Sequence, residues 1–283
     1  MRIAIASGKG GTGKTTVATN LAASVSGPVQ LLDCDVEEPN AHIFLPLEDM
    51  QKTVVGTMVP TVDTERCNLC GACSEICQFS AIMKLGETVM TFPEMCHSCR
   101  GCVMVCPEDA VGESSRELGE LVSGKAGHID LVYGRLRVGE AMSPPLIEAV
   151  KDCAADEGLI VIDAPPGTSC PVMTALRGVD FVVLVTEPTP FGYNDLVLAV
   201  EAVRTLNIPF GLVINRCDSG DRQVKDYAIS EKIPVLLEIP ERREIAEQYS
   251  RGVLIIDGVD GMRQVFEGLY ADIVGRIGAA VKT

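Results

Sequence analysis

The segment that most constrains the fold is a glycine-rich run near the start of the chain. Residues 8–16 read Gly-Lys-Gly-Gly-Thr-Gly-Lys-Thr-Thr, between an apolar stretch at 2–6 and a helix-forming stretch at 14–25. In a strand–loop–helix context this pattern is a P-loop, whose backbone N–H groups surround phosphate oxygens at a helix N-terminus. A glycine-rich turn without a ligand is the alternative, but the complete motif in register argues against it.

The residues of this loop have distinct expected roles. Lys14 should reach the β- and γ-phosphates, the Thr15 hydroxyl should ligate Mg²⁺, and Thr16 should lie toward the α-phosphate. The glycines permit close approach of the backbone to the ligand. The expected phosphate-binding set is Gly8, Lys9, Gly10, Gly11, Thr12, Gly13, Lys14, Thr15 and Thr16.

Much of the remaining chain alternates short apolar runs with helical stretches. Continuous apolar runs are typical of parallel strands that are covered on both faces. The alternation therefore predicts an α/β fold with a doubly wound, mostly parallel sheet and ligands at the carboxyl ends of its strands. The expected strands are 2–6, 29–33, 159–163, 180–185, 210–214 and 234–237, and the expected helices include 14–25, 194–206 and 260–279.

Eight of the twelve cysteines lie between Cys67 and Cys106 and interrupt this alternation. They form two runs with the spacing C-x2-C-x2-C-x3-C, the second followed by proline, which is typical of bacterial ferredoxins with two [4Fe–4S] clusters. In that pattern the fourth cysteine of each run ligates the other cluster. The first cluster site is thus expected to comprise Cys67, Cys70, Cys73 and Cys106, and the second cluster site Cys77, Cys96, Cys99 and Cys102.

Two zinc sites are the competing interpretation of these thiols, although the interleaved spacing favours iron–sulfur clusters. Cys77 is followed by Gln78 instead of proline, which loosens the match at one corner. We expect residues 59–112 to form a small inserted ferredoxin domain. Residues 1–58 and 113–283 would then form a discontinuous ATPase domain, to which a strand near 129–133 returns the chain.

Lys9 gives the P-loop a more specific character, because an ordinary P-loop does not need a lysine directly after its first glycine. The segment resembles the deviant P-loop of the MinD/ParA/Mrp and nitrogenase iron-protein ATPases, also described as CbiA-like. By that resemblance, Lys9 crosses a nucleotide-sandwich dimer to the partner's phosphates. The dimer would be a homodimer or a heterodimer with a related ATPase.

Three carboxylates extend the resemblance. Asp33 and Asp35 follow the second apolar run, and Asp163 opens the segment Asp-Ala-Pro-Pro-Gly after another one. The resemblance implies that Asp35 activates the attacking water and that Asp33 and Asp163 support the Mg²⁺ shell. Gly167 would offer its N–H to the γ-phosphate. The expected catalytic set is Lys9, Lys14, Asp35 and Asp163.

Recognition of the base depends on weaker signals. Asn215 resembles the adenine-contacting asparagine of this family, and Pro240, Glu241 and Arg242 resemble the loop that closes over the base. Ordinary strand-end turn chemistry is the alternative for this loop. Asp218 stands where a GTP-specific motif would have its aspartate, but the expected lysine is missing, so ATP is preferred.

Composition limits the partners. A net charge of −15 argues against nucleic-acid binding and against a basic membrane patch, so neither partner is expected. The chain starts directly with an apolar strand and has no secretory signal, so a cytoplasmic location is expected. A disulfide framework is then not expected. Cys34, Cys153 and Cys217 are expected to pack as small apolar residues in the core or near the surface. A cluster bridging two copies of Cys170 is a further hypothesis.

The leading functional hypothesis is an ATP-hydrolysing dimeric switch, slow without its partner, that is coupled to electron transfer or metallocluster assembly on a redox or metallocluster partner. Mrp-type carriers usually keep a Cys-x-x-Cys pair late in the ATPase domain, which this chain lacks. A MinD-like spatial organiser is a second hypothesis, although no basic amphipathic C-terminal helix is seen. An ATP-dependent amidating enzyme is a third, and it would need a glutaminase partner.

Overall fold

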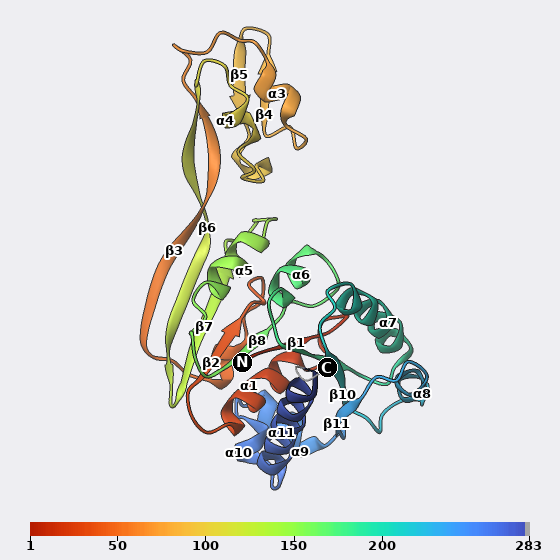
Figure 1. Cartoon of the computed structure of the whole chain (residues 1–283). Helices are drawn as coiled ribbons and strands as arrows, with labels where there is room; N and C mark the ends of the chain where they lie inside the picture. The colour runs from red at the N-terminus through yellow and green to blue at the C-terminus, as the bar shows by residue number, and fades with distance from the viewer. Residues whose placement is uncertain (281–283) are drawn as a thin grey trace. The chain divides into compact units, whose positions relative to one another are not determined.

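The computed structural model describes residues 1–280, which divide into two compact units. The nucleotide-binding unit comprises residues 1–53, 121–135 and 146–283, and the cysteine-rich unit comprises residues 54–120 and 136–145. Two long strands run from one unit into the other, β3 (Glu48–Val62) and β6 (Val111–Ala126) (Figure 1). Each unit is described by itself below.

The nucleotide-binding unit contains most of the helices and strands. Its strands are β1 (Arg2–Ala6), β2 (Val29–Asp33), β7 (Ile129–Leu136), β8 (Leu159–Asp163), β9 (Phe181–Thr186), β10 (Phe210–Asn215) and β11 (Val235–Ile239). Its helices are α1 (Lys14–Ser24), α2 (Ala41–Phe44), α5 (Pro144–Lys151), α6 (Cys170–Leu176), α7 (Pro190–Thr205), α8 (Gln223–Ser230), α9 (Arg243–Ser250), α10 (Ile255–Gly258) and α11 (Met262–Ala280).

The sheet follows the order β11-β10-β9-β1-β8-β2-β7-β6-β3. The pairs from β11 to β7 are parallel, which gives the mostly parallel α/β fold expected from the sequence. Asp33 and Asp163 are direct partners in the register of β2 and β8, and Ile5 of β1 also pairs with Asp163. The register therefore brings the two carboxylates beside the P-loop, which follows β1.

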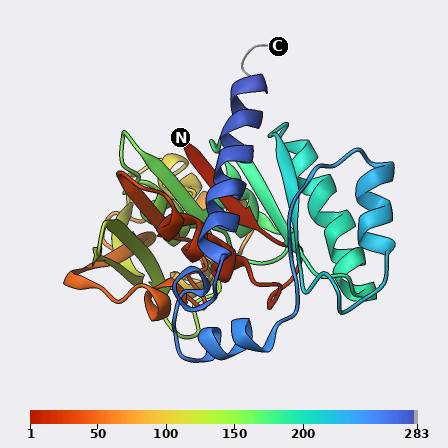
Figure 2. The ribbon, with the colours of Figure 1, turned by 90° about the horizontal axis from the view of Figure 1, so that it is seen from below.

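The helices cover both faces of this sheet. From β1 the chain passes through α1 to β2, toward the β3 edge of the sheet, and from β8 it passes through α6 to β9, toward the β11 edge. Because both crossovers are right-handed and run in opposite directions, α1 and α6 lie on opposite faces. Helices α10 and α11 pack on α1. Figure 2 shows α11 along this face, ending near the C-terminus. The expected helix at 260–279 is thus a core-docked element.

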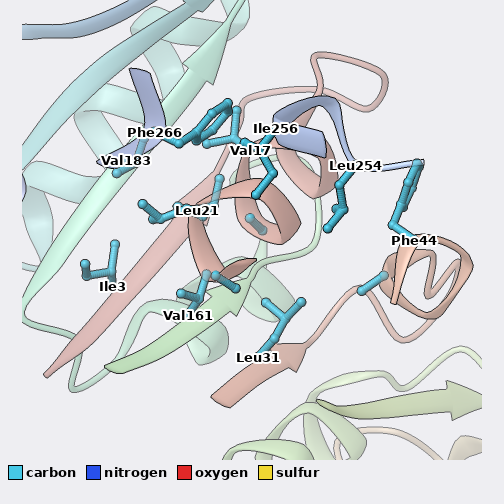
Figure 3. Close-up of a cluster of buried hydrophobic side chains, with 14 of the residues drawn as sticks. Ile3, Val17, Leu21, Leu31, Phe44, Val161, Val183, Leu254, Ile256 and Phe266 are labelled. Carbon is cyan, nitrogen blue, oxygen red and sulfur yellow. The ribbon is translucent and has the colours of Figure 1, made fainter. Parts of the chain in front are cut away.

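Burial of apolar side chains between sheet and helices stabilises this unit. Phe266 of α11 is fully buried and meets side chains of the sheet and of α1. Each such side chain contributes about 1.5–3 kcal/mol when it is removed from water. The side chains labelled in Figure 3 are Ile3, Val17, Leu21, Leu31, Phe44, Val161, Val183, Leu254, Ile256 and Phe266.

The cysteine-rich unit is built from short elements. They are α3 (Ala72–Ile76), β4 (Ile82–Leu85), β5 (Thr88–Thr91), the 3₁₀ helix η1 (Pro93–Met95) and α4 (Gly101–Met104), with β4 and β5 paired antiparallel. Helices α3 and α4 pack together. Among residues 1–280, no helix is both long and apolar enough to cross a membrane.

A 29-residue internal repeat extends from the cysteines to the backbone of this unit. Left-handed backbone conformations recur at equivalent positions of both halves, in the pairs Leu69 and Ser98, Gly71 and Arg100, and Ser80 and Asp109. Most are not glycine, so each costs of order 1 kcal/mol that the surrounding structure must offset. Both cysteine runs are therefore held in the same strained turns.

Candidate functional site

A pocket of about 870 Å³ lies in the nucleotide-binding unit beside the carboxyl ends of the strands. Its volume is in the range of small-molecule sites. Helix α1 begins at this pocket, and because its N-cap, Gly13, has no side chain, the first N–H groups of the helix remain available to a ligand. The expected residues that line the pocket are Gly10, Gly11, Gly13, Lys14, Thr15, Thr16, Asp35, Asn215, Pro240, Glu241 and Arg242.

Gly13 shows why the loop needs glycine. Its φ is +98°, and a Cβ at this position would lie 2.5 Å from Nδ2 of Asn215. The amide Nδ2 of Asn215 in turn donates to the carbonyl of Thr12 at 2.9 Å. The P-loop and the end of β10 are thus in direct contact, which joins the phosphate side of the pocket to the expected base side.

Asp163 is the most unusual carboxylate of the site. It is fully buried, and the hydroxyl of Thr15 donates to its Oδ2 at 2.6 Å. Within residues 1–280 its Oδ1 has no hydrogen-bond partner. Burial raises the pKa of Asp163 to about 6, although Lys14 and the Thr15 hydroxyl act in the opposite direction. A buried carboxylate oxygen beside a P-loop threonine fits a Mg²⁺ ion, which prefers oxygen ligands.

Lys14 and Asp35 form an ion pair at the same place. The Lys14 Nζ lies 3.6 Å from Oδ2 of Asp35, and the Lys14 side chain is almost completely buried. Burial raises the pKa of Asp35, and the positive charge of Lys14 lowers it only in part. A partly buried carboxylate next to the phosphate-binding lysine is suited to orient a water molecule at the γ-phosphate.

Asp33, expected in the Mg²⁺ shell, accepts hydrogen bonds from the loop after β2. Its Oδ1 accepts from the N–H of Asp35 at 3.1 Å, and its Oδ2 accepts from the N–H groups of Asn40 and Ala41 at 3.0 Å each. Burial and the charge of Asp163 raise its pKa well above the usual value. These contacts fit a carboxylate that holds the loop after β2, and they make a direct metal contact less favourable.

Lys9 is engaged within its own chain. Its Nζ forms an ion pair with Glu187, a residue directly after β9. The same carboxylate accepts from Nη1 of Arg216 at 3.2 Å. Sequence reasoning did not identify Glu187, because a single glutamate after a strand carries no motif. The role expected for Lys9 in a dimer would require its ammonium group to leave the Glu187 carboxylate.

Three other expected residues, Gly8, Thr12 and Gly167, are not among the residues that line the pocket. The N–H of Gly167, expected at the γ-phosphate, donates to the carbonyl of Ser7 at 2.9 Å. A Cβ on Gly8 would lie 2.1 Å from the carbonyl oxygen of Asp195, so the start of the loop packs closely on α7. The buried hydroxyl of Thr12 has no partner among the described residues, which leaves it free for a ligand or a water molecule.

The expected base side of the pocket is formed by the loop after β11 and by α9. Asp218 accepts the N–H of Glu241 at 2.7 Å, so Asp218 fixes this loop. Sequence analysis missed the lining side chains of α9, Ile245, Ala246 and Tyr249, and Ile255 of α10. The spacing of Ile245 and Tyr249 along one helix face was the available signal.

In the cysteine-rich unit, the four residues of the first cluster site line one small cavity. Asn68, Gly71 and Glu108 lie at the same cavity, together with apolar residues such as Val62 and Val89. Cys73 is buried, and burial raises the pKa of its thiol. The fold thus brings Cys106 of the second run to the three cysteines of the first run, as the interleaved pattern requires.

The second cluster site shows related contacts. Cys77 packs with the buried Cys96, Val59 and Ala81. The N–H of Ala81 donates to Sγ of Cys77 at 3.3 Å, and the equivalent N–H of Ala110 donates to Cys106 at 3.2 Å. Burial tends to raise the pKa of Cys77, but backbone N–H donors outweigh it and the pKa is lowered.

These thiols do not form a single-ion site. Among residues 1–280, no three His, Cys, Asp or Glu side chains lie close enough together to hold a metal ion. A [4Fe–4S] cubane is larger than one ion and takes its thiolates from around a cavity. A cavity lined by four cysteines and N–H groups directed at sulfur are features that a cluster would use, and cluster binding stays a prediction.

The other four cysteines are dispersed. Cys34 is completely buried and burial raises the pKa of its thiol, as expected for a packing residue. Cys217 is partly buried and Cys153 is exposed, so of the core or near-surface positions expected for these residues Cys153 takes a surface one. Cys170 is exposed at the start of α6, and no contact tests its bridging role.

The comparisons with known proteins agree with this pocket. Residues 3–255 match the family model described as the CobQ/CobB/MinD/ParA nucleotide binding domain. The chain belongs to this family. An uncharacterized protein of Methanocaldococcus jannaschii is 33% identical over 246 residues, which cover 85% of this chain and 87% of the relative.

Two further similarities mark the range of the family. An iron-sulfur cluster carrier protein of Aquifex aeolicus is 26% identical over 272 residues, covering 90% of this chain and 61% of the carrier. The septum site-determining protein MinD of Pyrococcus horikoshii, solved with Mg-ADP, superposes with a TM-score of 0.58 at 20% identity, covering 96% of this chain and 95% of that one. At this identity the likeness establishes the fold alone.

Proposed function

We propose that the protein is an ATP-hydrolysing switch that dimerises around its nucleotide and holds two [4Fe–4S] clusters in residues 59–112. One observation carries the proposal: Lys14, Thr15, Asp35 and Asp163 converge at the start of α1, beside the pocket. A lysine, a hydroxyl and two carboxylates are the groups that phosphoryl transfer to water requires.

Each residue would contribute by its position. Lys14 would leave Asp35 for the β- and γ-phosphates, and the Thr15 hydroxyl would turn from Asp163 to the metal ion, which supplies charge neutralisation when it is bound. Asp35, released from Lys14, would orient water and accept its proton. Asp163 would support the metal through Oδ1, which has no partner within residues 1–280. Asn215, Pro240, Glu241 and Arg242 would hold the base.

The Lys9–Glu187 contact supports the switch. In the isolated chain Glu187 neutralises Lys9, whereas a partner's triphosphate would compete for the same ammonium group. Nucleotide states shift an equilibrium only through such differential contacts. Relatives named iron-sulfur cluster carrier proteins support a redox or metallocluster protein as the partner that senses the switch.

The test uses the full chain, purified without oxygen. We expect hydrolysis of ATP, a shift toward the dimer with ATP and Mg²⁺, and about eight iron atoms per chain, as two cubanes require. Lys14→Ala should reduce hydrolysis on the order of 100-fold or more, because it removes a charge that stabilises the transition state.

Lys125→Ala is the matched control, because Lys125 is exposed and its ion pair with Asp130 lies at the surface. The control should hydrolyse ATP like the parent. Unchanged hydrolysis in Lys14→Ala would overturn the nucleotide part of the proposal. Zinc or no metal in the oxygen-free protein would overturn the cluster part.

A further inference from the structure

The 29-residue repeat of the cysteine-rich unit brings a pair of side chains into contact in each half. Asn68 follows the first cysteine of the first run, and Glu108 lies two residues after the last cysteine of the second run. His97 follows Asn68 by 29 residues. Glu108 follows Phe79 by the same interval, so Phe79 and His97 form the equivalent pair. Each pair joins one residue from each run, as the cysteines of each cluster site do.

The first of these pairs lies at the first cluster site. Nδ2 of Asn68 donates to Oε1 of Glu108 at 3.0 Å, and Oδ1 of Asn68 accepts the N–H of Cys70 at 3.0 Å. Asn68 and Glu108 both line the cavity that is also lined by the four cysteines of this site. The two hydrogen bonds therefore hold a carboxylate at the cavity in which the first cluster would sit.

The equivalent pair of the second half carries no carboxylate. The rings of Phe79 and His97 stack with their centroids 3.5 Å apart and their planes at 11°. The contact between the two positions is thus present in both halves of the repeat. Its chemistry differs, because two stacked rings replace an amide that is hydrogen-bonded to a carboxylate.

Other charges occur in both halves in a similar way. The side chain of Lys84 passes Gly71 of the first site, since its Cδ lies 3.5 Å from the position that a Cβ on Gly71 would take. Arg100 takes the equivalent position in the second half, and it pairs with Glu113 at 3.0 Å. Glu108 differs from Glu113 because it accepts from a neutral amide and lines a cavity with cysteines.

The hydrogen bonds to sulfur also differ between the two sites. Both sites have an N–H donor to the fourth cysteine of one run, as described above. Within residues 1–280, the second site has in addition the N–H of Ser98, which donates to Sγ of Cys96 at 3.4 Å. Donors to sulfur stabilise the reduced form of a cluster, so this contact raises the potential of the second site relative to the first.

We propose that Asn68 holds Glu108 at the first cluster and that this carboxylate lowers the reduction potential of the first cluster below that of the second. Each cluster takes up one electron, supplied by dithionite in the test, and no bond is broken. The electron adds negative charge, which a carboxylate at the same cavity destabilises. The inference rests on the clusters of the proposed function.

The experiment is an anaerobic redox titration of the full chain, with EPR of the reduced clusters and an iron count for each variant. Glu108→Gln keeps an oxygen that can accept from Asn68 and removes the charge. It should raise the lower of the two potentials and leave the higher one unchanged. Because Glu108 is exposed and water screens its charge, we expect about a threefold change in the equilibrium constant for reduction. This change corresponds to about 28 mV, at 59 mV per tenfold change for one electron.

The repeat supplies the reciprocal variant. Phe79→Glu puts a carboxylate at the equivalent position of the second half and should lower the higher potential by a similar amount. Phe79→Gln, which removes the same ring without adding a charge, is its matched control and should not produce this shift. The two charge variants should thus narrow the gap between the potentials from opposite ends, which a merely structural role of these residues would not do.

Glu87→Gln is the control for Glu108→Gln. Glu87 is exposed in the turn between β4 and β5 and is not among the residues that line the cavity of the first site. It should leave both potentials unchanged.

The outcomes separate this inference from the proposed function. Equal potentials in the wild type, or potentials that stay in place or move together in Glu108→Gln, would overturn the inference and leave the proposed function intact. A wild-type chain without iron would overturn the cluster part of the proposed function and the inference together.

Discussion

The two units of this protein are stabilised in different ways. The nucleotide-binding unit buries long apolar strands and helices such as α1 and α11 around Phe266, so its sequence supplies its own core. In the cysteine-rich unit, the buried clusters consist of a few apolar residues, such as Ile82 and Val111, packed with cysteines. Its helices have four or five residues. The first unit has an extensive apolar core of its own, whereas the second would depend on the clusters proposed for its thiols.

The largest expected difference between the two units is their response to the removal of iron. Because the cysteine-rich unit has a small core and strained turns, it should lose its structure with its clusters. Amide exchange between Cys67 and Cys106 should accelerate by about 100-fold or more, while peptides from Leu159–Asp163 keep their protection. Hydrogen exchange with and without an iron chelator measures both; equal protection in the two states would contradict the prediction.

A cavity in the apolar core should affect the other unit. Phe266→Ala removes a fully buried ring and should lower the free energy of unfolding of the nucleotide-binding unit by about 3–5 kcal/mol. Phe191→Ala, at an exposed ring of α7, should change it by less than about 0.5 kcal/mol. Denaturant unfolding measures both, and iron per chain should be unchanged. A loss of iron in Phe266→Ala would show that the units are not stabilised independently.

The free energy of unfolding should depend on pH because the site contains buried carboxylates. Asp163 has a pKa of about 6 in the folded chain, above its ordinary value of 3.8, so the folded form binds the proton more tightly. The free energy of unfolding therefore rises as the pH falls through 6 toward 4, and the charged form destabilises the chain above pH 6. Asp163→Asn should remove about 2 kcal/mol of this dependence.

Unfolding of the nucleotide-free chain between about pH 4 and pH 8 tests this. The difference between wild type and Asp163→Asn contains the titration of Asp163 and the change that the substitution makes in the pKa of Asp33, which the charge of Asp163 raises. Asp130→Asn, at an exposed carboxylate, is the control. A difference that does not vary with pH would refute the assignment.

The smallest expected effect concerns Glu187. Glu187→Gln weakens the contacts of this side chain with Lys9 and Arg216. Because the Lys9 side chain is 29% exposed and can be hydrated, the free energy of unfolding should fall by only about 0.5–1 kcal/mol. The released Lys9 should favour the ATP-dependent dimer, measured by size-exclusion chromatography. Glu231→Gln, which loses an exposed pair with Arg204, should not change dimerisation. Weaker dimerisation in Glu187→Gln would exclude the competition between Glu187 and the nucleotide.

Much of the sheet could be predicted because its strands are buried on both faces. The range 159–163 agrees with β8 at both ends, since a short run rich in β-branched residues between Gly158 and Asp163 is too short for a buried helix. Helix α7 begins at Pro190, four residues before the expected start. Thr189 caps it by accepting the N–H of Gly192, and that glycine obscured the start in the sequence.

The long strands β3 and β6 could not be predicted. Residues 48–54 of β3 are exposed or carry polar side chains, so the apolar pattern that identifies a strand is absent from this part. The residues of the candidate site also fall into a group that could be predicted and a group that could not. Motif residues such as Lys14 and Thr15 line the pocket, whereas Glu187 became visible only through its ion pair with Lys9, which lies far away in the sequence. Pairing across the fold carries no local signal.

The place of the cysteine-rich unit in the chain has a consequence for biosynthesis. Strand β1 pairs with β8 and β9, and β2 pairs with β7 and β8, all of which follow the cysteines in the sequence. A ribosome therefore releases the P-loop and then all eight clustered cysteines before the central strands can find their neighbours. Non-local pairing of this kind is slow. If the proposed clusters bind, their cysteines leave the ribosome while the nucleotide pocket is still unformed.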